Sequence, residues 1–392
     1  MNCKSNIHRL YVIKMAKWFM LTMPILMLYY KEHGFSDAQA FQLKAFYSLS
    51  IVLFEIPSGY FADVLGRKLT LVIGAILGTL GFLIYSVTSG FACFLLAEVT
   101  LGIGQSFISG ADSAMLYDTL KHADRTHDYL KYEGRSYTIG NFSESLAGVL
   151  GGLLATVSLR LPFAFQTLIA FTAVPAALTL IEPPVGRRRK NPGMMDILRI
   201  VKYATVTNRP LRYNLLISSV LGTATLTMAW TYPLYLKDAG FQVGAIGAVA
   251  AVLNLVVGIT TLFAHRIESR LKPVRTIWLT SVLITSVFLL LGFIQSAWAV
   301  TILVLFYFSR GIATPVLKYY VNRITASEVR ATVLSVRTLI IRLIFVGLAP
   351  SFGWLSDSFS RPVAMRALGL AFTVLVGGAI ALFLRTLRSL DE

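Results

Sequence analysis

Long apolar runs are the feature of this sequence that most restricts its fold. A helix that crosses a bilayer needs about 20 mostly apolar residues. Stretches of that kind occur twelve times, near residues 10–31, 40–62, 69–88, 90–118, 134–158, 161–181, 211–236, 242–264, 275–294, 297–322, 329–356 and 364–385. Of the 392 residues, 56% are hydrophobic and only 14% are charged, whereas soluble domains are about a quarter charged. We therefore predict an all-α membrane protein with twelve transmembrane helices.

One long polar connection divides these runs into two groups of six. Residues 182–210 contain the cluster RRRK at 187–190 and several prolines. We predict an N-terminal six-helix bundle over 1–181, a cytoplasmic basic linker over 182–210 and a C-terminal six-helix bundle over 211–392. Within the linker, residues 194–207 have the pattern of an amphipathic helix at the membrane surface.

The two groups resemble each other in sequence. YKEHGF at 30–35 corresponds to LKDAGF at 236–241, an offset of 206 residues, and each hexapeptide ends the first span of its group. Pseudo-symmetric halves arranged in parallel are typical of transporters that bind their solute between the halves near the middle of the bilayer.

The cations fall mostly on one side of the predicted spans. That side receives Lys4, Arg9, Lys14, Arg67, Lys68, Lys121, Arg125, Lys131, Arg135, residues 187–190, Arg199, Lys202, Arg266, Arg270, Lys272, Arg275, Arg323, Arg330, Arg385 and Arg388; the other side receives Lys31, Arg160, Lys237, Arg361 and Arg366. Because basic loops stay in the cytoplasm, we predict a multi-pass protein of the cytoplasmic (inner) membrane with both termini inside. The net charge of +17 then reflects topology rather than nucleic-acid binding.

Several other classes of function lack their sequence signals. The five histidines have no metal-site spacing, and Cys3 and Cys93 do not suggest a disulfide framework. No phosphate-binding G-x-x-x-x-G-K-[ST] loop and no nucleophile–histidine–acid set occurs. We expect a monomer without enzymatic activity, cofactor or metal, whose partners are the lipid bilayer, a small solute and protons.

The connection between the second and third spans carries a recognisable motif, Gly59-x-x-x-Asp63-x-x-Gly66-Arg67-Lys68. It resembles the signature loop of the major facilitator superfamily, G-x-x-x-D-[RK]-x-G-[RK]-[RK], and departs from it at Val64. In that family, the loop forms part of a cytoplasmic gate. The resemblance implies that Asp63 faces the start of the eleventh span and that Arg67 pairs with Asp118. Simple topology-setting charge is the alternative.

The second half carries an altered copy of this loop. Ala264-x-x-x-Glu268-x-x-Leu271-Lys272 lies 205 residues after Gly59. In the fourth span, family members often have an arginine four residues before Gly-x-Gly, where this chain has Glu98. In the fifth span, drug exporters often have Gly-Pro-x-x-Gly-Gly, and residues 147–152 lack that proline. The resemblance is to the branch of drug and metabolite exporters.

Several charges lie well inside predicted spans, where each costs a few kcal/mol if it faces lipid. They are Glu55, Glu98, Asp112 and Glu144 in the first half, and Arg310, Lys318, Arg337 and Arg342 in the second. One interpretation is structural pairing. The other is that an acid, preferably Glu98 near the middle of its span or Glu144 about 15 Å into its span, carries a proton, with Glu55 and Asp112 as further candidates. The three arginines, Arg310, Arg337 and Arg342, would then bind an anionic group of the solute.

Spans one, four, seven and ten line the solute cavity in this architecture. They supply a mainly aromatic and methionine set, for which helix packing is the alternative role: Trp18, Met23, Met27, Phe107, Trp230, Tyr232, Tyr307 and Phe308. We predict a proton-coupled exporter of small amphipathic organic molecules that works by alternating access. Uptake of an organic anion or metal chelate, and a non-transporting receptor or lipid-binding scaffold, are the alternatives.

Overall fold

The computed structural model describes residues 5–183, 199–325 and 329–391, and all regular secondary structure in these ranges is helical. The helices are α1 (Ser5–Trp18), α2 (Leu26–Glu32), α3 (Asp37–Val64), α4 (Arg67–Val87), α5 (Phe91–His122), α6 (Tyr129–Val157), α7 (Leu161–Leu178), α9 (Arg209–Asp238), α10 (Val243–Leu291), α11 (Ala299–Arg323), α12 (Arg330–Ser358) and α13 (Arg361–Asp391), with a 3₁₀ turn η1 (Thr126–Asp128) and a π-helical turn η2 (Tyr203–Thr207). The all-α prediction is confirmed. The predicted cluster 187–190 and the first five residues of the predicted surface helix, 194–198, lie outside the described residues, whereas residues 199–207 are helical.

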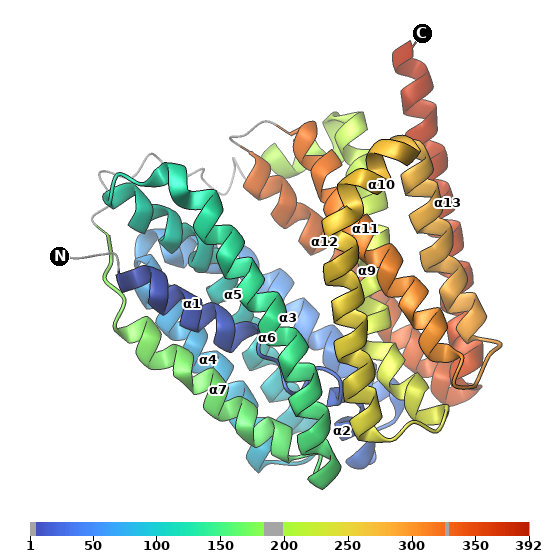
Figure 1. Cartoon of the computed structure of the whole chain (residues 1–392), viewed down its shortest axis with the longest axis horizontal. Coiled ribbons are helices and arrows are strands. Elements are labelled where there is room, and N and C mark those ends of the chain that lie inside the picture. The colour runs from blue at the N-terminus through green and yellow to red at the C-terminus, as the bar shows by residue number, and fades with distance from the viewer. Residues whose placement is uncertain (1–4, 184–198, 326–328, 392) are drawn as a thin grey trace. The chain divides into compact units, whose positions relative to one another are not determined.

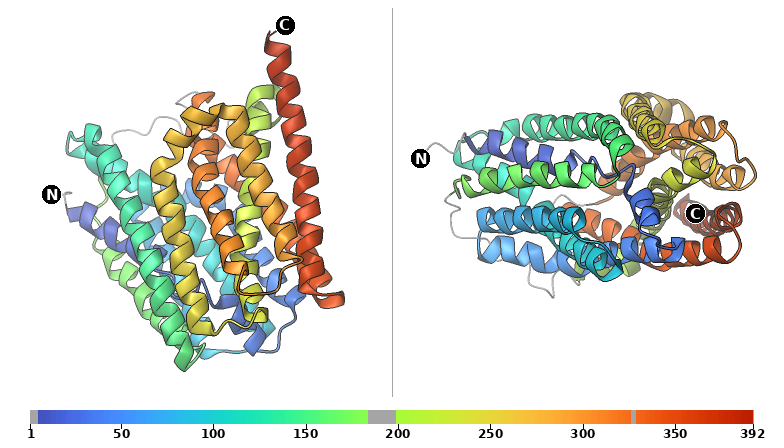
Figure 2. Two further views of the ribbon diagram at one scale, coloured as in Figure 1. Left: turned by 45° about the vertical axis from the view of Figure 1, so that its right-hand side comes forward. Right: turned by 90° about the horizontal axis from the view of Figure 1, so that it is seen from below.

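The chain forms two compact units. Unit 1 consists of residues 1–191 and 242–252, and unit 2 of residues 192–241 and 253–392. In unit 1, α1 packs between α6 and α7, while α4 packs against α5 and α7 (Figures 1 and 2). In unit 2, α9 packs against α11, α12 and α13. The start of α10 groups with unit 1, because Gly247 of α10 lies against Gly152 of α6 so closely that a Cβ on Gly152 would be 2.7 Å from the Gly247 Cα. Small residues permit such approaches between membrane helices.

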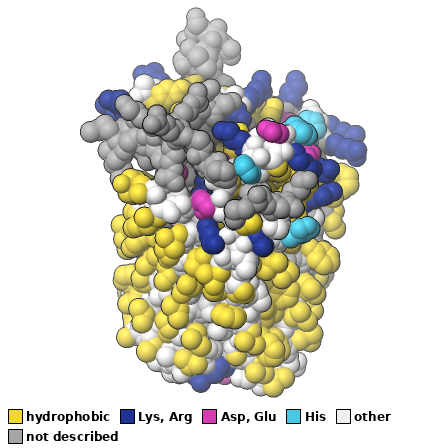
Figure 3. Space-filling view, turned by 90° about the vertical axis from the view of Figure 1, so that its left-hand side faces the viewer, with side chains coloured by type: hydrophobic (Ala, Val, Ile, Leu, Met, Phe, Trp, Pro, Cys, Tyr) yellow, Lys and Arg dark blue, Asp and Glu magenta, His cyan; other side chains and the backbone are white. Residues whose placement is uncertain are grey.

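Among the described residues, nine helices are long and apolar enough to cross a membrane. One of them, α10, covers two predicted spans and is interrupted at Lys272, which has a φ of 66°. The predicted first and fifth spans correspond to α1 with α2 and to α6. The helix of the first span is broken, and the helix of the fifth span, α6, is rich in polar residues. Apolar side chains cover much of one face of the molecule, and lysine, arginine and histidine side chains gather at one end of it (Figure 3).

Backbone geometry repeats between the two halves of the sequence. Gly34 and Gly240 have φ values of 77° and 87°, Gly66 and Lys272 have φ values of 101° and 66°, and each pair is 206 residues apart. The sequence pattern aligned Gly66 with Leu271, an offset of 205 residues. The backbone geometry instead aligns Gly66 with Lys272, an offset of 206 residues. A lysine in this left-handed region carries a steric cost of roughly 1–2 kcal/mol that glycine avoids.

The first predicted span, 10–31, is not one continuous helix. It is interrupted over residues 19–25, because Pro24 has no N–H and its ring clashes with the carbonyl four residues earlier. The freed N–H of Leu21 donates to Oε1 of Gln166 in α7 at 2.8 Å, and Gln166 is fully buried. Irregular backbone at membrane depth is tolerated where protein supplies such partners.

Helix α6 passes directly beside this break. A Cβ added to Gly151 would be 2.0 Å from the Leu21 carbonyl oxygen, so no larger residue fits without moving the backbone. The partial glycine motif of the fifth span therefore has a packing role here.

We expect Gly151→Ala to lower the thermal stability of the purified protein, because overpacking costs about 1–3 kcal/mol. Gly134→Ala in the same helix is the control, since a Cβ at Gly134 meets nothing within 4 Å. Thermal unfolding of both variants in the same detergent measures the difference. Equal melting temperatures would contradict the close contact at Leu21.

Candidate functional site

The signature loop is fixed by two sets of contacts within unit 1. The Arg67 guanidinium, at the start of α4, forms an ion pair with Asp118 of α5 and also donates to the carbonyl of Ala114. Asp118 is buried, with 7% of its surface exposed. The structure thus brings together the two residues that the family resemblance pairs.

A carboxylate that the sequence analysis did not consider completes this loop. The backbone N–H groups of Arg67 and Lys68 donate to the two carboxylate oxygens of Glu182, at 2.9 and 2.7 Å. A carboxylate is favoured at a helix N-terminus, where free N–H groups and the helix dipole attract an anion. Gly66 is required beside it, because its φ is 101° and a Cβ there would lie 3.3 Å from the Glu182 carboxyl carbon.

Glu182 lies four residues after the last residue of α7, and the residue before it is held as well. The side-chain amide of Asn6 in α1 donates to the Ile181 carbonyl at 2.7 Å and accepts from the Ile181 N–H at 2.9 Å. The beginning of the linker is therefore fastened to both α1 and α4. The acidic residue at the start of an otherwise basic linker was the available sequence signal.

For two further residues of the predicted gate, Asp63 and Gly59, the structure shows no contact of the kind found at Arg67 with the described residues of unit 1. Asp63 is the second-last residue of α3 and is half-buried, and its predicted contact with the eleventh span stays a prediction. Within unit 1, no described residue lies within 4 Å of a Cβ placed on Gly59, so no helix of this unit makes the close approach that a small residue permits.

Glu98 lies in a closed polar cluster between α2, α3, α4 and α5. Its carboxylate accepts from the Lys44 ammonium at 2.9 Å to both oxygens, from the Tyr30 hydroxyl at 2.6 Å and from the Tyr85 hydroxyl at 2.7 Å. Glu98 is fully buried and Lys44 is 3% exposed. Aromatic rings surround the cluster, with the Tyr85 and Phe94 ring centres 4.9 Å apart. A cation and two hydroxyl donors satisfy the buried carboxylate, which favours the structural alternative for Glu98.

The position of Glu98 also differs from the prediction. It is the eighth of the 32 residues of α5 and so lies near the start of that helix, not near its middle. Lys44 is likewise the eighth residue of α3. Lys44 was not predicted as the partner of Glu98. The available sequence signal was a single cation inside an apolar run, at the same distance from the start of its helix as Glu98.

Asp112 of α5 is paired with the first helix. Its carboxylate lies 3.2 Å from the Lys14 ammonium and 3.8 Å from that of Lys17. Lys14, which was counted among the cations of the cytoplasmic side, lies inside α1 with 13% of its side chain exposed. Nearby, the Ser113 hydroxyl donates to Glu133 at 2.8 Å. These groups line a cavity of about 10 Å³, near the lower limit for one water molecule.

The remaining acidic candidates and the predicted cavity-lining residues lie as follows. Glu55 in α3 and Glu144 in α6 are half-buried, as is Trp18 at the end of α1. Four predicted cavity-lining aromatic residues are buried to 7% exposure or less, namely Phe107, Trp230, Tyr232 and Tyr307. Their burial favours a packing role.

The arginines of unit 2 contact residues of the neighbouring helices. The Arg337 guanidinium in α12 donates to the hydroxyl and carbonyl of Ser218 in α9. The Arg310 guanidinium lies 5.3 Å from the centre of the Tyr307 ring, which in turn lies 6.1 Å from the Tyr232 ring. Arg310, Tyr307 and Tyr232 therefore form one group. Arg342 lies five residues after Arg337 in α12 and is half-buried.

Comparison with known proteins decides the family. The family model described as Major Facilitator Superfamily matches residues 10–350. The chain belongs to the major facilitator superfamily. Two solved superfamily structures share its fold: the nucleoside transporter NupG, with a TM-score of 0.82 at 15% identity over 98% of this chain and 99% of that one, and a bacterial homolog of the human lysosomal transporter Spinster, with a TM-score of 0.77 at 16% identity over 97% and 96%.

Sequence relatives within the superfamily include a transporter named for drug resistance. The Quinolone resistance protein NorA of Staphylococcus aureus is 28% identical over 164 residues, which cover 42% of this chain and 41% of that protein. An uncharacterized MFS-type transporter of Methanocaldococcus jannaschii is 20% identical over 240 residues, or 59% and 61% of the two chains. The chain therefore matches less than two thirds of the length of either relative.

The buried ion pair gives a stability test. Glu98→Gln or Lys44→Met alone leaves an uncompensated buried charge, which costs about 3–5 kcal/mol. We expect the double variant to recover part of that loss, as measured by thermal unfolding of all three variants and the parent chain.

The control for this test is Asp128→Asn, at a surface ion pair where the hydrogen bond from Arg125 lowers the pKa of the Asp128 carboxyl. Surface pairs contribute little, so its melting temperature should stay near that of the parent. Additive losses in the double variant would argue against direct coupling of Lys44 and Glu98.

Proposed function

We propose that this superfamily transporter is a proton-coupled antiporter that exports small amphipathic organic molecules across the cytoplasmic membrane, as a monomer with both termini inside. Similarity to the quinolone resistance protein is the observation that carries the proposal of export. Membership of a family of secondary transporters supports alternating access.

The contacts of the signature loop support a moving gate. Arg67 is tied to Asp118 and the first N–H groups of α4 are tied to Glu182, so α4, α5 and the start of the linker respond together to a change at this loop. Asp63 and Lys68, on the two sides of Gly66, complete the proposed cytoplasmic gate.

We propose Glu144 as a proton carrier, because it is half-buried about 15 Å into the predicted fifth span. Glu98 already has a cation and two hydroxyl donors around its carboxylate, and Asp112 has two lysines. Protonation of either acid would cost those interactions. Glu55 is the second candidate, because like Glu144 it is half-buried within a helix.

Uptake of an organic anion is the second candidate function. It is supported by Arg310 beside Tyr307, since a guanidinium and an aromatic ring together suit a planar carboxylated solute. The retained gate residues argue against a non-transporting receptor, which has no need for them.

Reconstituted liposomes distinguish these functions. With a quinolone as the first probe, proton antiport predicts accumulation when the vesicle interior is acidic, and proton symport predicts accumulation when the exterior is acidic. Glu144→Gln should abolish gradient-driven accumulation while leaving solute exchange without a gradient. Solutes of other classes follow if the quinolone is not transported. Absence of any solute flux under either gradient would refute transport.

A separate measurement tests the gate. We expect Asp63→Asn to lower the turnover of transport much more than the affinity for the solute, because the residue acts on the movement of the helices and not on binding. Initial rates over a range of solute concentrations separate the two quantities. A change confined to the apparent KM would contradict the gate.

A further inference from the structure

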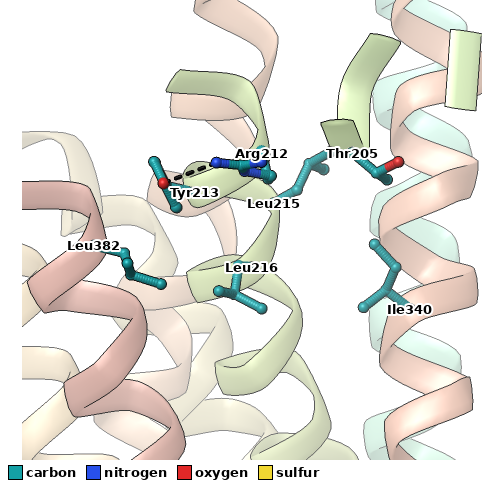
Figure 4. A pocket seen from close by; sticks show the side chains of 7 residues that line it. All are labelled: Thr205, Arg212, Tyr213, Leu215, Leu216, Ile340 and Leu382. Carbon is teal, nitrogen blue, oxygen red and sulfur yellow. Dashed lines mark hydrogen bonds between the residues drawn. The ribbon is translucent and has the colours of Figure 1, made fainter. Parts of the chain in front are cut away.

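Unit 2 contains a groove of about 490 Å³ at the start of α9 (Figure 4). Seven residues from four elements line it: Thr205 of η2, Arg212, Tyr213, Leu215 and Leu216 of α9, Ile340 of α12 and Leu382 of α13. The groove shares none of the gate residues or the proposed proton carriers. The chemistry of the residues that line the groove therefore indicates what binds there.

The groove is polar at one level and apolar at another. Arg212 and Tyr213 are the fourth and fifth residues of α9. The Arg212 guanidinium donates to the Tyr213 hydroxyl at 2.9 Å, and Figure 4 shows both side chains above Leu216 and Ile340. Leu216 lies one helical turn, about 5–6 Å, further along α9. A ligand that fits has a hydrogen-bonding head and an apolar tail.

The charge around the groove selects an anionic head. Arg212 is the only ionisable cation or acid among the lining residues, and two exposed cations, Lys202 and Arg209, lie close to it in sequence on either side of η2. Arg212 is half-buried, and its guanidinium carbon lies 4.8 Å from the centre of the Tyr213 ring. Arginine in this setting binds phosphate through paired N–H groups.

The apolar part of the groove reaches the surface of unit 2. Leu382 remains 38% exposed on α13, and Leu216 and Ile340 are half-buried. Tyrosine is typical of the level at which lipid headgroups meet the hydrocarbon. Basic pockets between membrane helices at this level suit anionic lipid headgroups.

We propose that this groove is a binding site for an anionic phospholipid. The Arg212 guanidinium and the Tyr213 hydroxyl hold the phosphate, and Leu216, Ile340 and Leu382 contact the upper part of an acyl chain. The site does not involve the transported solute, so its test is independent of the test of the proposed function.

Native mass spectrometry of the purified full-length chain tests the headgroup contact. Phosphatidylglycerol or phosphatidylcholine is added in the same detergent and the lipid-bound fraction is measured. We expect Arg212→Gln to reduce retained phosphatidylglycerol at least fivefold. Arg270→Gln, an exposed arginine of α10 outside the groove, is the matched control and should bind like the parent. Equal losses in both variants, or equal retention of the two lipids by the parent, would overturn the proposal.

A second pair of variants tests the groove itself. Leu216→Trp fills its apolar part and should abolish selective retention although Arg212 is present. Leu255→Trp introduces the same side chain at a position of α10 that is 54% exposed and should leave retention unchanged, with melting temperatures verifying that both variants fold.

The outcomes of this second test separate the possible occupants. Unchanged binding by Leu216→Trp would show that the lipid is held by surface charge or that another segment of the chain fills the groove. Displacement of the lipid by a quinolone at transport concentrations would assign the groove to the solute instead. Either result refutes a lipid site.

Discussion

An unpaired backbone amide or ionised side chain in hydrocarbon costs several kcal/mol, and unit 1 meets this constraint at two places. At the break in the first span, the buried amide of Gln166 takes the Leu21 N–H and Gly151 leaves room for the Leu21 carbonyl. Near the N-terminal ends of α3 and α5, Lys44 and Glu98 neutralise each other, and two tyrosine hydroxyls complete the hydrogen bonds of the carboxylate. These contacts connect α2, α3, α4, α5, α6 and α7 into one body.

The same constraint separates structural charges from charges available for transport. Glu98 and Asp112 are already compensated by lysines within the unit. A carboxylate that releases and accepts a proton during a transport cycle has to lose its stabilising partners at some stage, and that is most costly where three donors surround it. Glu98 and Asp112 are therefore less suited than the other acidic candidates to carry a proton.

The signature loop connects the gate to the start of the linker. Glu182 binds the first N–H groups of α4, Asn6 holds the adjacent Ile181, and Arg67 binds Asp118. These contacts hold α1, α4, α5 and the residues that follow α7 together within unit 1.

The sequence by itself determined the fold class, the family and most helix positions, because apolar length and the motif from Gly59 to Lys68 are local properties of the chain. It also indicated the Arg67–Asp118 pair through the family resemblance. Which buried charges pair could not be read in the same way. Lys44 and Glu98 are 54 residues apart, and whether they meet depends on how α3 and α5 pack. Only the tertiary structure decided that Glu98 is compensated, that Glu182 caps α4 and that Arg212 stands over an apolar groove, since each of these depends on side chains brought together from different helices.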